Sequence, residues 1–324
     1  MISASYPAGP ILPHGAYHLK KGLLPNVKYY PGNLAIEFNL LGGAAIADPM
    51  APETVTITSL KGLVPPWQNI EQKGSTQDGS SYITSLYDPI DIELGVRIRG
   101  RDPFWTRKVV SDWAASWDAK IPGYLVWSTL EMGSWWASVR QGKPPIEAYT
   151  GGIGRTNEQK FTWPGKAYDA FWVTDDDTDF AFGSSVFQFL NRFNAGDQPM
   201  FDKYVCLGPG TFHFQDGPGS TNYVTYGPLT ASQCVQIDTD PRKRGVVALV
   251  GTFDVPIIGA VTAVAPFSVN PYSLLQGRFS DNAGIPAKQP GVPATKHHVW
   301  VVIEGGNSNS TIVAYGTPKR RLPF

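Results

Sequence analysis

The chain has 324 residues, of which 42% are hydrophobic and 17% are charged, so it can build packed cores and carries too little charge for disorder. Its 27 basic and 27 acidic residues cancel to a formal net charge of zero, which argues against a nucleic-acid-binding protein. The length predicts two domains or one large β domain, and the 34 glycines and 28 prolines predict short strands joined by turns.

The N-terminal part of the chain is predicted to start as an irregular arm and to continue as short strands. Residues 1–33 contain five prolines and little periodicity, which indicates an extended arm. Strands are expected over residues 33–41, 54–60 and 81–87, and the turn at 77–79 precedes the last of them.

A longer strand is predicted over residues 90–99, where apolar and polar side chains alternate throughout. The apolar positions are Ile90, Ile92, Leu94, Val96 and Ile98. The charged positions are Asp91, Glu93, Arg97 and Arg99. This period of two predicts an antiparallel strand with one buried face. The charged face is either solvated or part of a subunit interface with complementary charges.

A helix is predicted directly after this strand. Asp102 is a suitable N-cap and Pro103 suits the first helical position. One apolar stripe is formed by Val109, Val110, Trp113 and Trp117. The helix is expected to run to about Lys120, because Pro122 ends it. We expect its tryptophans to pack against a sheet, in preference to forming a ligand platform.

The sequence after the helix predicts a hairpin and further strands of the same domain. The hairpin strands span residues 124–132 and 135–140, around Gly133-Ser134. Additional strand-like segments are expected over residues 160–163, 170–173 and 180–190.

A polar stretch at residues 194–199 is the predicted domain boundary, which divides the chain into domains 1–193 and 194–324. Strands of the second domain are expected over residues 203–207, 211–215, 222–226, 233–238, 245–250, 298–304 and 311–315. A loop of low periodicity is expected over residues 254–296. The strand spacing and the turns predict a second β-sandwich.

The search for chemistry finds no catalytic, cofactor-binding or metal site. No zinc motif, Walker A motif or G-x-S-x-G elbow occurs, and His297 and His298 would point to opposite faces of a strand. The acidic run at residues 175–179 is read as a solvated loop or, alternatively, as a calcium site that lacks the EF-hand spacing. Cys206 and Cys234 are either two buried thiols or a single disulfide.

The N-terminal sequence has no recognisable secretion signal, and the apolar run at residues 255–269 is too short to span a bilayer. These features predict a soluble protein made in the cytoplasm.

Several segments carry a family resemblance. Residues 62–120 contain GLVPPWQNIEQKGSTQDGSS, DPIDIELGVRIRGRDPFW and SDWAASWDAK. The second half adds NAGDQPMFDKYVCLGPGTFHFQDGPGS, IDTDPRKRGVV, NPYSLLQGRFS and VIEGGNSNSTIVAYGTPKRR. These segments resemble the minor tail proteins of actinobacteriophages, which correspond to the distal tail protein family of long-tailed phages with non-contractile tails.

The resemblance implies a structural protein of the virion tail tip that is assembled in the host cytoplasm, and it implies neither catalysis nor a cofactor. Members form a ring, usually a hexamer, that continues the tail tube, surrounds the channel for DNA and the tape measure protein, and seats the tip or hub proteins. The N-terminal domain would be a tail-tube-like β-sandwich with a flanking helix and a long hairpin. The C-terminal domain would be a galectin-like β-sandwich. The arm at 1–33 and the loop at 254–296 are less typical of the family.

For such a ring, we expect contacts from the strands at 80–100 and the hairpin at 124–140. The charges of Asp91, Glu93, Arg97 and Arg99 would help to set the register between subunits. Cyclic symmetry with heterologous contacts closes such a ring.

Two other functions compete with this one. A carbohydrate- or receptor-binding tail module would use exposed aromatic side chains of the second domain to bind a host glycan, while side fibres are a further partner to consider. It has less support, because Trp300 is the only tryptophan in that half. A cell-wall hydrolase is the third reading, and no catalytic constellation supports it. Sequence-specific binding of nucleic acid is not expected.

Overall fold

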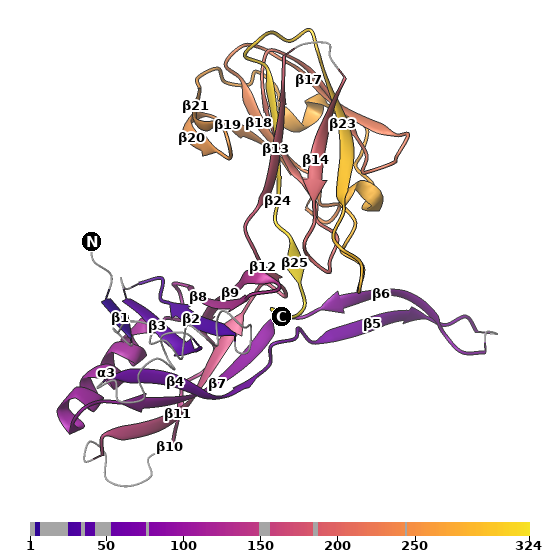
Figure 1. The fold of residues 1–324 in the computed structure, drawn as a ribbon. Helices are drawn as coiled ribbons and strands as arrows, with labels where there is room; N and C mark the ends of the chain where they lie inside the picture. Colours follow the sequence, from indigo (N-terminus) through magenta and orange to yellow (C-terminus); the bar gives the residue numbers. More distant parts are fainter. Residues whose placement is uncertain are drawn as a thin grey trace. The chain divides into compact units, whose positions relative to one another are not determined.

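The computed structural model describes residues 4–6, 25–33, 36–42, 53–75, 78–148, 156–183, 187–243 and 245–324. The chain divides into two compact units (Figure 1). Unit 1 comprises Met1–Val173 and Arg321–Phe324, and unit 2 comprises Thr174–Arg320. Strands dominate both units, which confirms the predicted mainly-β class.

Unit 1 is built on one large sheet with the strand order β1-β3-β2-β8-β9-β11-β7-β4. Its strands are β1 (Ala4–Tyr6), β2 (Asn26–Tyr30), β3 (Ile36–Leu41), β4 (Thr54–Lys61), β7 (Ile90–Arg99), β8 (Gly123–Thr129), β9 (Gly133–Gln141), β10 (Ile146–Ala148), β11 (Glu158–Ala167) and β12 (Trp172–Val173). The sheet folds over, so that β2, β3, β8 and β9 form one layer and β4, β7 and β11 the other (Figure 1).

Strand β2 corrects the prediction of an irregular arm over residues 1–33. It lies between β3 and β8, with Val27 and Tyr29 buried. The prolines at positions 25 and 31 indicated irregular structure. The alternation that marks a strand is confined to the five residues between them, which is too short a pattern to outweigh the prolines. Strand β1 also falls in this arm, and the rest of the arm up to residue 24 lies outside the described residues.

Strand β7 confirms the predicted alternation. Its five apolar side chains are buried, and its four charged side chains are exposed. The strand pairs with β4 on one side and with β11 on the other. Because both hydrogen-bonding edges are occupied within the subunit, β7 can meet a partner only through its charged face.

The predicted helix is α3 (Pro103–Ser116), and the side chain of Asp102 caps it by accepting a hydrogen bond of 2.9 Å from the Trp105 amide. The helix ends four residues before Lys120, the predicted end. Trp117 takes an extended backbone conformation, which lets its indole stack on the ring of Tyr29 with a centroid distance of 4.5 Å. The helix therefore ends at the stacking contact of Trp117 with Tyr29, and does not extend to the position that Pro122 would set.

The tryptophans of this segment form the core of unit 1, as predicted. Trp113 is fully buried and contacts Tyr29, Phe38 and Trp163 at centroid distances of 5.6, 5.0 and 6.0 Å. These partners come from both layers of the sheet. The helix therefore closes the opening between the layers and holds them together.

The hairpin predicted after the helix is confirmed as β8 and β9, with its turn at residues 130–132 in place of Gly133-Ser134. Gly133 starts β9 with a φ of 71°, a conformation that favours glycine. Strand β8 also pairs with β2, and β9 also pairs with β11. The hairpin thus joins the two layers, with β8 paired along its length and β9 paired to β11 only at its end.

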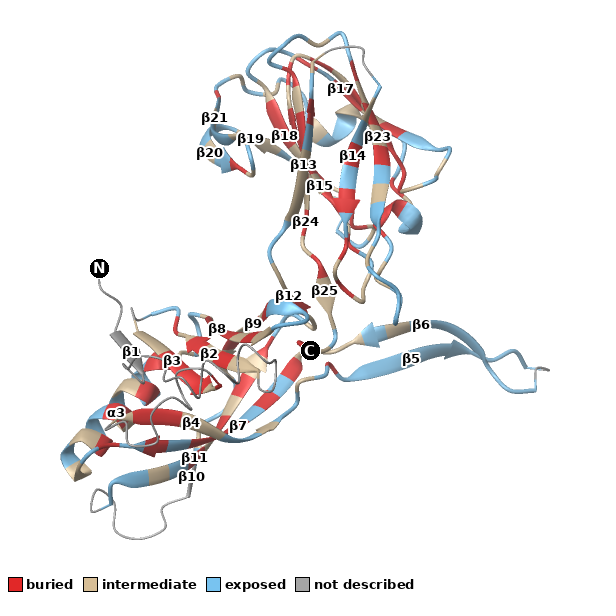
Figure 2. Ribbon diagram, viewed as in Figure 1, coloured by how far each residue is buried: buried red, intermediate tan, exposed pale blue. Residues whose placement is uncertain are grey.

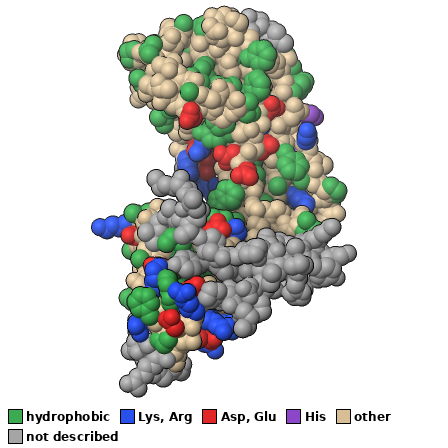
Figure 3. Space-filling model, turned by 60° about the vertical axis from the view of Figure 1, so that its left-hand side comes forward, with side chains coloured by type: hydrophobic (Ala, Val, Ile, Leu, Met, Phe, Trp, Pro, Cys, Tyr) green, Lys and Arg blue, Asp and Glu red, His purple; other side chains and the backbone are tan. Residues whose placement is uncertain are grey.

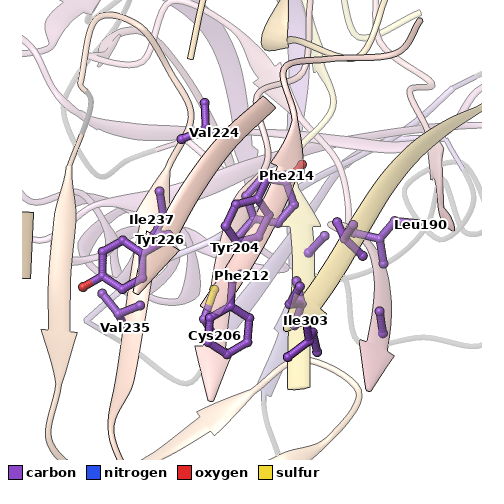
Figure 4. Close-up of a cluster of buried hydrophobic side chains, with 14 of the residues drawn as sticks. Leu190, Tyr204, Cys206, Phe212, Phe214, Val224, Tyr226, Val235, Ile237 and Ile303 are labelled. Carbon is purple, nitrogen blue, oxygen red and sulfur yellow. The ribbon is translucent and has the colours of Figure 1, made fainter. Parts of the chain in front are cut away.

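Unit 2 is a β-sandwich. The sheet β13-β24-β15-β18-β19 consists of β13 (Asp177–Phe182), β24 (Thr311–Gly316), β15 (Lys203–Leu207), β18 (Cys234–Asp238) and β19 (Val246–Leu249). The sheet β14-β23-β16-β17-β22 consists of β14 (Gln188–Phe193), β23 (Lys296–Glu304), β16 (Gly210–Gln215), β17 (Tyr223–Leu229) and β22 (Leu275–Gln276). Aromatic and aliphatic side chains from both sheets meet between them (Figure 4).

The observed division of the chain differs from the predicted boundary at 193/194. Residues 174–193 belong to unit 2, because β13 pairs with β24 and β14 pairs with β23. Both partners lie more than a hundred residues later in the chain, so local sequence could not show these pairings. The polar stretch at 194–199 is a connection inside unit 2.

The segment predicted as a loop over 254–296 contains regular structure. Strands β20 (Gly251–Val255) and β21 (Gly259–Ala263) form a hairpin that covers the outer face of the β24-β15-β18 strands. Two 3-10 turns, η1 (Pro271–Leu274) and η2 (Asp281–Ala283), follow. The prediction of a continuous loop is therefore wrong for these elements.

Both cysteines are free, buried thiols. Cys206 pairs in register with Val235 and faces the core between the sheets, whereas Cys234 faces the β20–β21 hairpin. The two thiols thus point to opposite faces of one sheet, which excludes the disulfide alternative. Burial raises the pKa of both thiols, so neither is poised as a nucleophile.

The acidic run at residues 175–179 is a solvated loop only at Asp175 and Asp176, because Asp177 already begins β13. The Asp179 carboxylate accepts a hydrogen bond of 2.6 Å from the Asn191 amide, and the Asp177 carboxylate accepts one of 2.9 Å from the Phe193 amide. Two carboxylates of β13 therefore cap amides on the open edge of β14. Within the described part of the chain, no group of three or more His, Cys, Asp or Glu side chains could hold a metal ion.

Candidate assembly surface

Strands β5 (Trp67–Gln72) and β6 (Ser81–Tyr87) form a two-stranded ribbon that belongs to unit 1. The two strands are antiparallel, with Trp67 opposite Tyr87 and Ile70 opposite Thr84. Among the described residues, neither strand pairs with any other strand. The ribbon extends away from the sheet of unit 1 (Figure 1). Strand β6 was predicted from the sequence, and β5 was not.

The ribbon is exposed along almost its whole length (Figure 2). Its exposed apolar side chains are Trp67, Ile70, Tyr82, Ile83 and Leu86. Tyr82 is 64% exposed and Trp67 is 58% exposed. Large apolar side chains that gather on one exposed element mark an interaction surface.

The apolar side chains lie on both faces of the ribbon. The register places Ile70 and Leu86 on one face and Trp67 on the other. A bulge at Ile83 brings Tyr82 to the Trp67 face, where its hydroxyl lies 2.9 Å from Ser85 Oγ. Neither face is covered by unit 1. An isolated two-stranded hairpin is only marginally stable in water. A partner that covered both faces would supply the burial that this ribbon lacks.

The base of the ribbon is fastened to unit 1. The Trp172 indole donates a hydrogen bond of 2.9 Å to the Leu63 carbonyl, just before the ribbon. The Asp88 amide donates one of 2.8 Å to the Pro66 carbonyl, which joins the two ends of the ribbon at its base. The ring of Tyr87 contacts that of Phe171 with a centroid distance of 5.0 Å. These contacts fix where the ribbon leaves the unit.

The four charged residues predicted to form a ring interface lie together on the exposed face of β7. Lys166 Nζ is 3.5 Å from Asp91 Oδ1, and Lys61 Nζ is 3.8 Å from Glu93 Oε2. These ion pairs join neighbouring strands of the same subunit. Exposed pairs of this kind contribute about 0–1 kcal/mol each. The role of Asp91, Glu93, Arg97 and Arg99 between subunits remains a prediction.

Charge on unit 1 is mixed in sign. On the face drawn in Figure 3, basic and acidic side chains lie beside one another and among hydrophobic ones. A surface with both signs can form complementary contacts with a second copy of itself.

In the β8–β9 hairpin, which was also expected at subunit contacts, β8 pairs with β2, whereas the outer edge of β9 is paired among the described residues only at Trp136, Arg140 and Gln141. Its turn, with Leu130 and Met132 exposed, and the first part of the β9 edge are the parts of the hairpin that a partner could meet.

Sequence reasoning missed the apolar residues of β5. Trp67 and Ile70 lie on opposite faces, so the segment shows no period of two, and two prolines precede it. The available signal was the polar, glycine-containing segment at residues 73–80, which separates two strand-length runs and is typical of a hairpin loop.

Comparisons with known proteins agree with this architecture. The sequence matches no protein-family model and no curated protein. The structure is similar to the crystal structure of the SPP1 Dit protein, described as a paradigm of the hub adsorption apparatus in phages that infect Gram-positive bacteria. The TM-score is 0.50 with 11% identity, over 82% of this chain and 93% of the SPP1 chain.

Chains from the activated phage P2 baseplate, solved with Ca and with Sr, match over 92% of this chain and 99% of theirs, with TM-scores of 0.44 and 10% identity. The P2 values are too low to support an argument. The SPP1 match shows a shared fold and confirms, at the level of fold, the resemblance to distal tail proteins that the sequence predicts.

Proposed function

We propose that this protein is a structural subunit of a phage tail tip, where copies of the chain form a closed ring that joins the tail tube to the tip or hub proteins. The observation that carries the proposal is the β5–β6 ribbon, which is exposed and apolar on both faces. The SPP1 Dit fold supports it. This role is structural and needs no catalytic group.

A ribbon of this kind fits a head-to-tail ring. In a heterologous interface, one surface of a subunit meets a different surface of the next, and the ring closes when the rotation between subunits is a whole fraction of a turn. The ribbon projects from its own unit, so it can reach a neighbouring subunit on each of its two faces. We propose six copies, as the family resemblance implies.

The charged face of β7 is proposed as a second part of the same interface. Asp91 and Glu93 lie at one end of the strand, and Arg97 and Arg99 lie at the other. Opposite charges at the two ends of one strand would favour a single register against a neighbour and disfavour slipped registers. The partners proposed along the tail axis are the tail tube protein, the tip or hub protein and the tape measure protein.

The ring is tested by the mass of the purified full chain in solution, measured by light scattering and native mass spectrometry. We expect a hexamer for the wild type and a monomer for Ile83→Asp. Val247→Asp is the matched control, because Ile83 and Val247 are both 54% exposed and both lie in strands, with Val247 in unit 2. A wild type that stays monomeric at high concentration, and that imaging of particles does not find on the tail axis, would overturn the proposal.

The charge arrangement has a separate test. The double charge reversal Arg97→Glu and Arg99→Glu should weaken the ring and make its dissociation less sensitive to salt. If the reversed variant assembles as the wild type does, the charges do not set the register, and the ribbon alone carries the contact.

A further inference from the structure

The outer face of the sheet β14-β23-β16-β17 in unit 2 carries a group of aromatic side chains that the proposed ring contacts do not use. We call this group the aromatic face, and its residues are Phe187, Phe189, His213, Tyr223, His298 and Trp300. They come from neighbouring strands, except that Phe187 immediately precedes β14. Phe189 lies opposite Trp300 in the register. The rings thus stand on a rigid, hydrogen-bonded support.

The rings form one continuous series of contacts. The centroid of Phe187 is 5.0 Å from that of Phe189 and 5.5 Å from that of Trp300, on which it stacks. Trp300 is 6.1 Å from Tyr223, which in turn is 6.1 Å from His213. His298 extends the series beside Phe189.

Four of these six side chains are exposed, while Trp300 and His213 are half-buried. Phe187, Phe189 and Tyr223 are each more than half exposed. The opposite sheet of the sandwich differs, because the β20–β21 hairpin covers much of its outer face. A continuous exposed apolar surface costs solvation free energy and marks an interaction site.

Hydrogen-bonding side chains border the rings. His213 Nδ1 lies 2.9 Å from Thr225 Oγ1, and His213 Nε2 lies 3.3 Å from Glu304 Oε2. Glu304 is largely exposed. Asn191 pairs with His298 in the register and lies on β14, the edge strand of this sheet. Donors and acceptors are therefore present at both ends of the series of rings.

We propose that the aromatic face binds a glycan. A pyranose ring has a C–H surface that packs on an aromatic ring, and a rim of hydroxyl groups that both donate and accept hydrogen bonds. Trp300 and Phe187 supply the stacking surface, while the Glu304 carboxylate, held by His213, and the Asn191 side-chain amide supply planar polar partners. The large apolar side chains that are exposed on these strands are all aromatic, which suits sugar stacking better than the aliphatic contacts of a protein core.

The aromatic face was not predicted from the sequence, for two reasons. The predicted boundary placed Phe187 and Phe189 in the first domain, apart from Trp300. The sequence argument against glycan binding counted only tryptophan, whereas phenylalanine and tyrosine supply three of the six rings of this surface.

The test uses the purified full chain in native gels cast with one soluble polysaccharide each: mixed-linkage β-glucan, galactomannan, arabinogalactan or amylopectin. We expect at least one polysaccharide to retard the wild type. Trp300→Ala and Phe187→Ala should then raise the dissociation constant by roughly tenfold or more. Phe182→Ala is the matched control, because Phe182 is 57% exposed and Phe187 is 54% exposed, yet Phe182 lies on the other sheet. It should bind as the wild type does.

Three results would overturn the proposal. The first is a wild type that none of the four polysaccharides retards. The second is equal retardation of the Phe187→Ala and Phe182→Ala variants, with folding of both checked by circular dichroism. The third is a change in the mass of the assembly caused by Phe187→Ala, which would make this face a contact between protein chains. Ring formation is measured separately, so loss of glycan binding leaves the proposed tail-tip role untouched.

Discussion

Replacing Arg192 by methionine should destabilise unit 2 more than replacement of any comparable surface arginine. Arg192 lies in β14 and its side chain is completely buried. Its Nε and Nη2 atoms donate hydrogen bonds of 2.9 and 2.7 Å to the Asp202 carboxylate. Nη1 lies 2.8 Å from Asp177 Oδ2, as an ion pair without the geometry of a hydrogen bond. One cation thus connects β14, β13 and the start of β15.

The loss of unfolding free energy is set by the buried Asp202 carboxylate that Arg192→Met leaves without its cation. Methionine fills most of the arginine volume, so the cavity is small, but the Asp202 carboxylate stays 2% exposed and loses its cation. Removal of one partner from a buried ion pair costs about 3–5 kcal/mol. For a unit of this size, that free energy corresponds to a fall in Tm of roughly 6–20 °C.

Differential scanning calorimetry of the full chain measures the effect, because it can resolve separate transitions of the two units. Arg242→Met is the matched control. Arg242 forms the same type of contact, with Nε 2.9 Å from Asp240 Oδ1, but its side chain is 70% exposed. The Asp240 carboxylate is itself buried, but it keeps the 3.0 Å hydrogen bond from the Arg242 backbone amide in the variant, and the lost guanidinium is open to water. The control should therefore lose less stability than Arg192→Met and melt within a few degrees of the wild type. Equal losses in the two variants would refute the reasoning that burial of the pair sets its importance.

Two further predictions concern single side chains. Asp102→Ala removes the N-cap of α3 and should lower the free energy of unfolding of unit 1 by about 1 kcal/mol, measured by denaturant titration, whereas Asp112→Ala in the same helix should change it less. Burial raises the pKa of Asp177, so the folded unit binds this proton more tightly than the unfolded chain does. The destabilising contribution of the ionised group is therefore relieved as the pH falls through the raised pKa toward the ordinary value of 3.8. The Tm difference between the wild type and Asp177→Asn should accordingly shift in favour of the wild type on acidification, and a constant difference would contradict the sign.

Local sequence was enough wherever one segment determines its own structure. The alternation from Ile90 to Ile98 identified both the strand and its buried face, because a period of two has no other simple explanation. The Asp102-Pro103 pair located the start of the helix for a similar local reason. The end of that helix escaped prediction, because Trp117 leaves it to stack on Tyr29, a partner from another strand.

Pairing between distant segments explains the remaining differences. Residues 174–193 were assigned to the wrong domain because their strands pair with β23 and β24 near the end of the chain. The acidic run was read as a solvated loop because its hydrogen-bond partners, the amides of Asn191 and Phe193, belong to another strand. The apolar residues of β5 were missed because Trp67 and Ile70 are three positions apart and lie on opposite faces, so the strand shows no period of two. Only its pairing with β6 identifies it as a strand.

The treatment of strand edges connects the fold with the proposed function. An open edge or an uncovered apolar ribbon invites uncontrolled pairing between chains, and natural proteins block such features unless they use them. On β14 the carboxylates of Asp177 and Asp179 occupy amides of the open edge. These carboxylates therefore make the β14 edge less able to pair with a strand of another chain.

The β5–β6 ribbon shows the opposite treatment. Its apolar side chains lie on both exposed faces, and the base of the ribbon is fastened to unit 1 by Trp172 and Phe171. A ribbon held at its base and left uncovered along its length is arranged for a regular partner. One chain protects the edge of β14 and leaves this ribbon open, which is the contrast that the proposed ring requires if the ribbon meets a further copy of the chain.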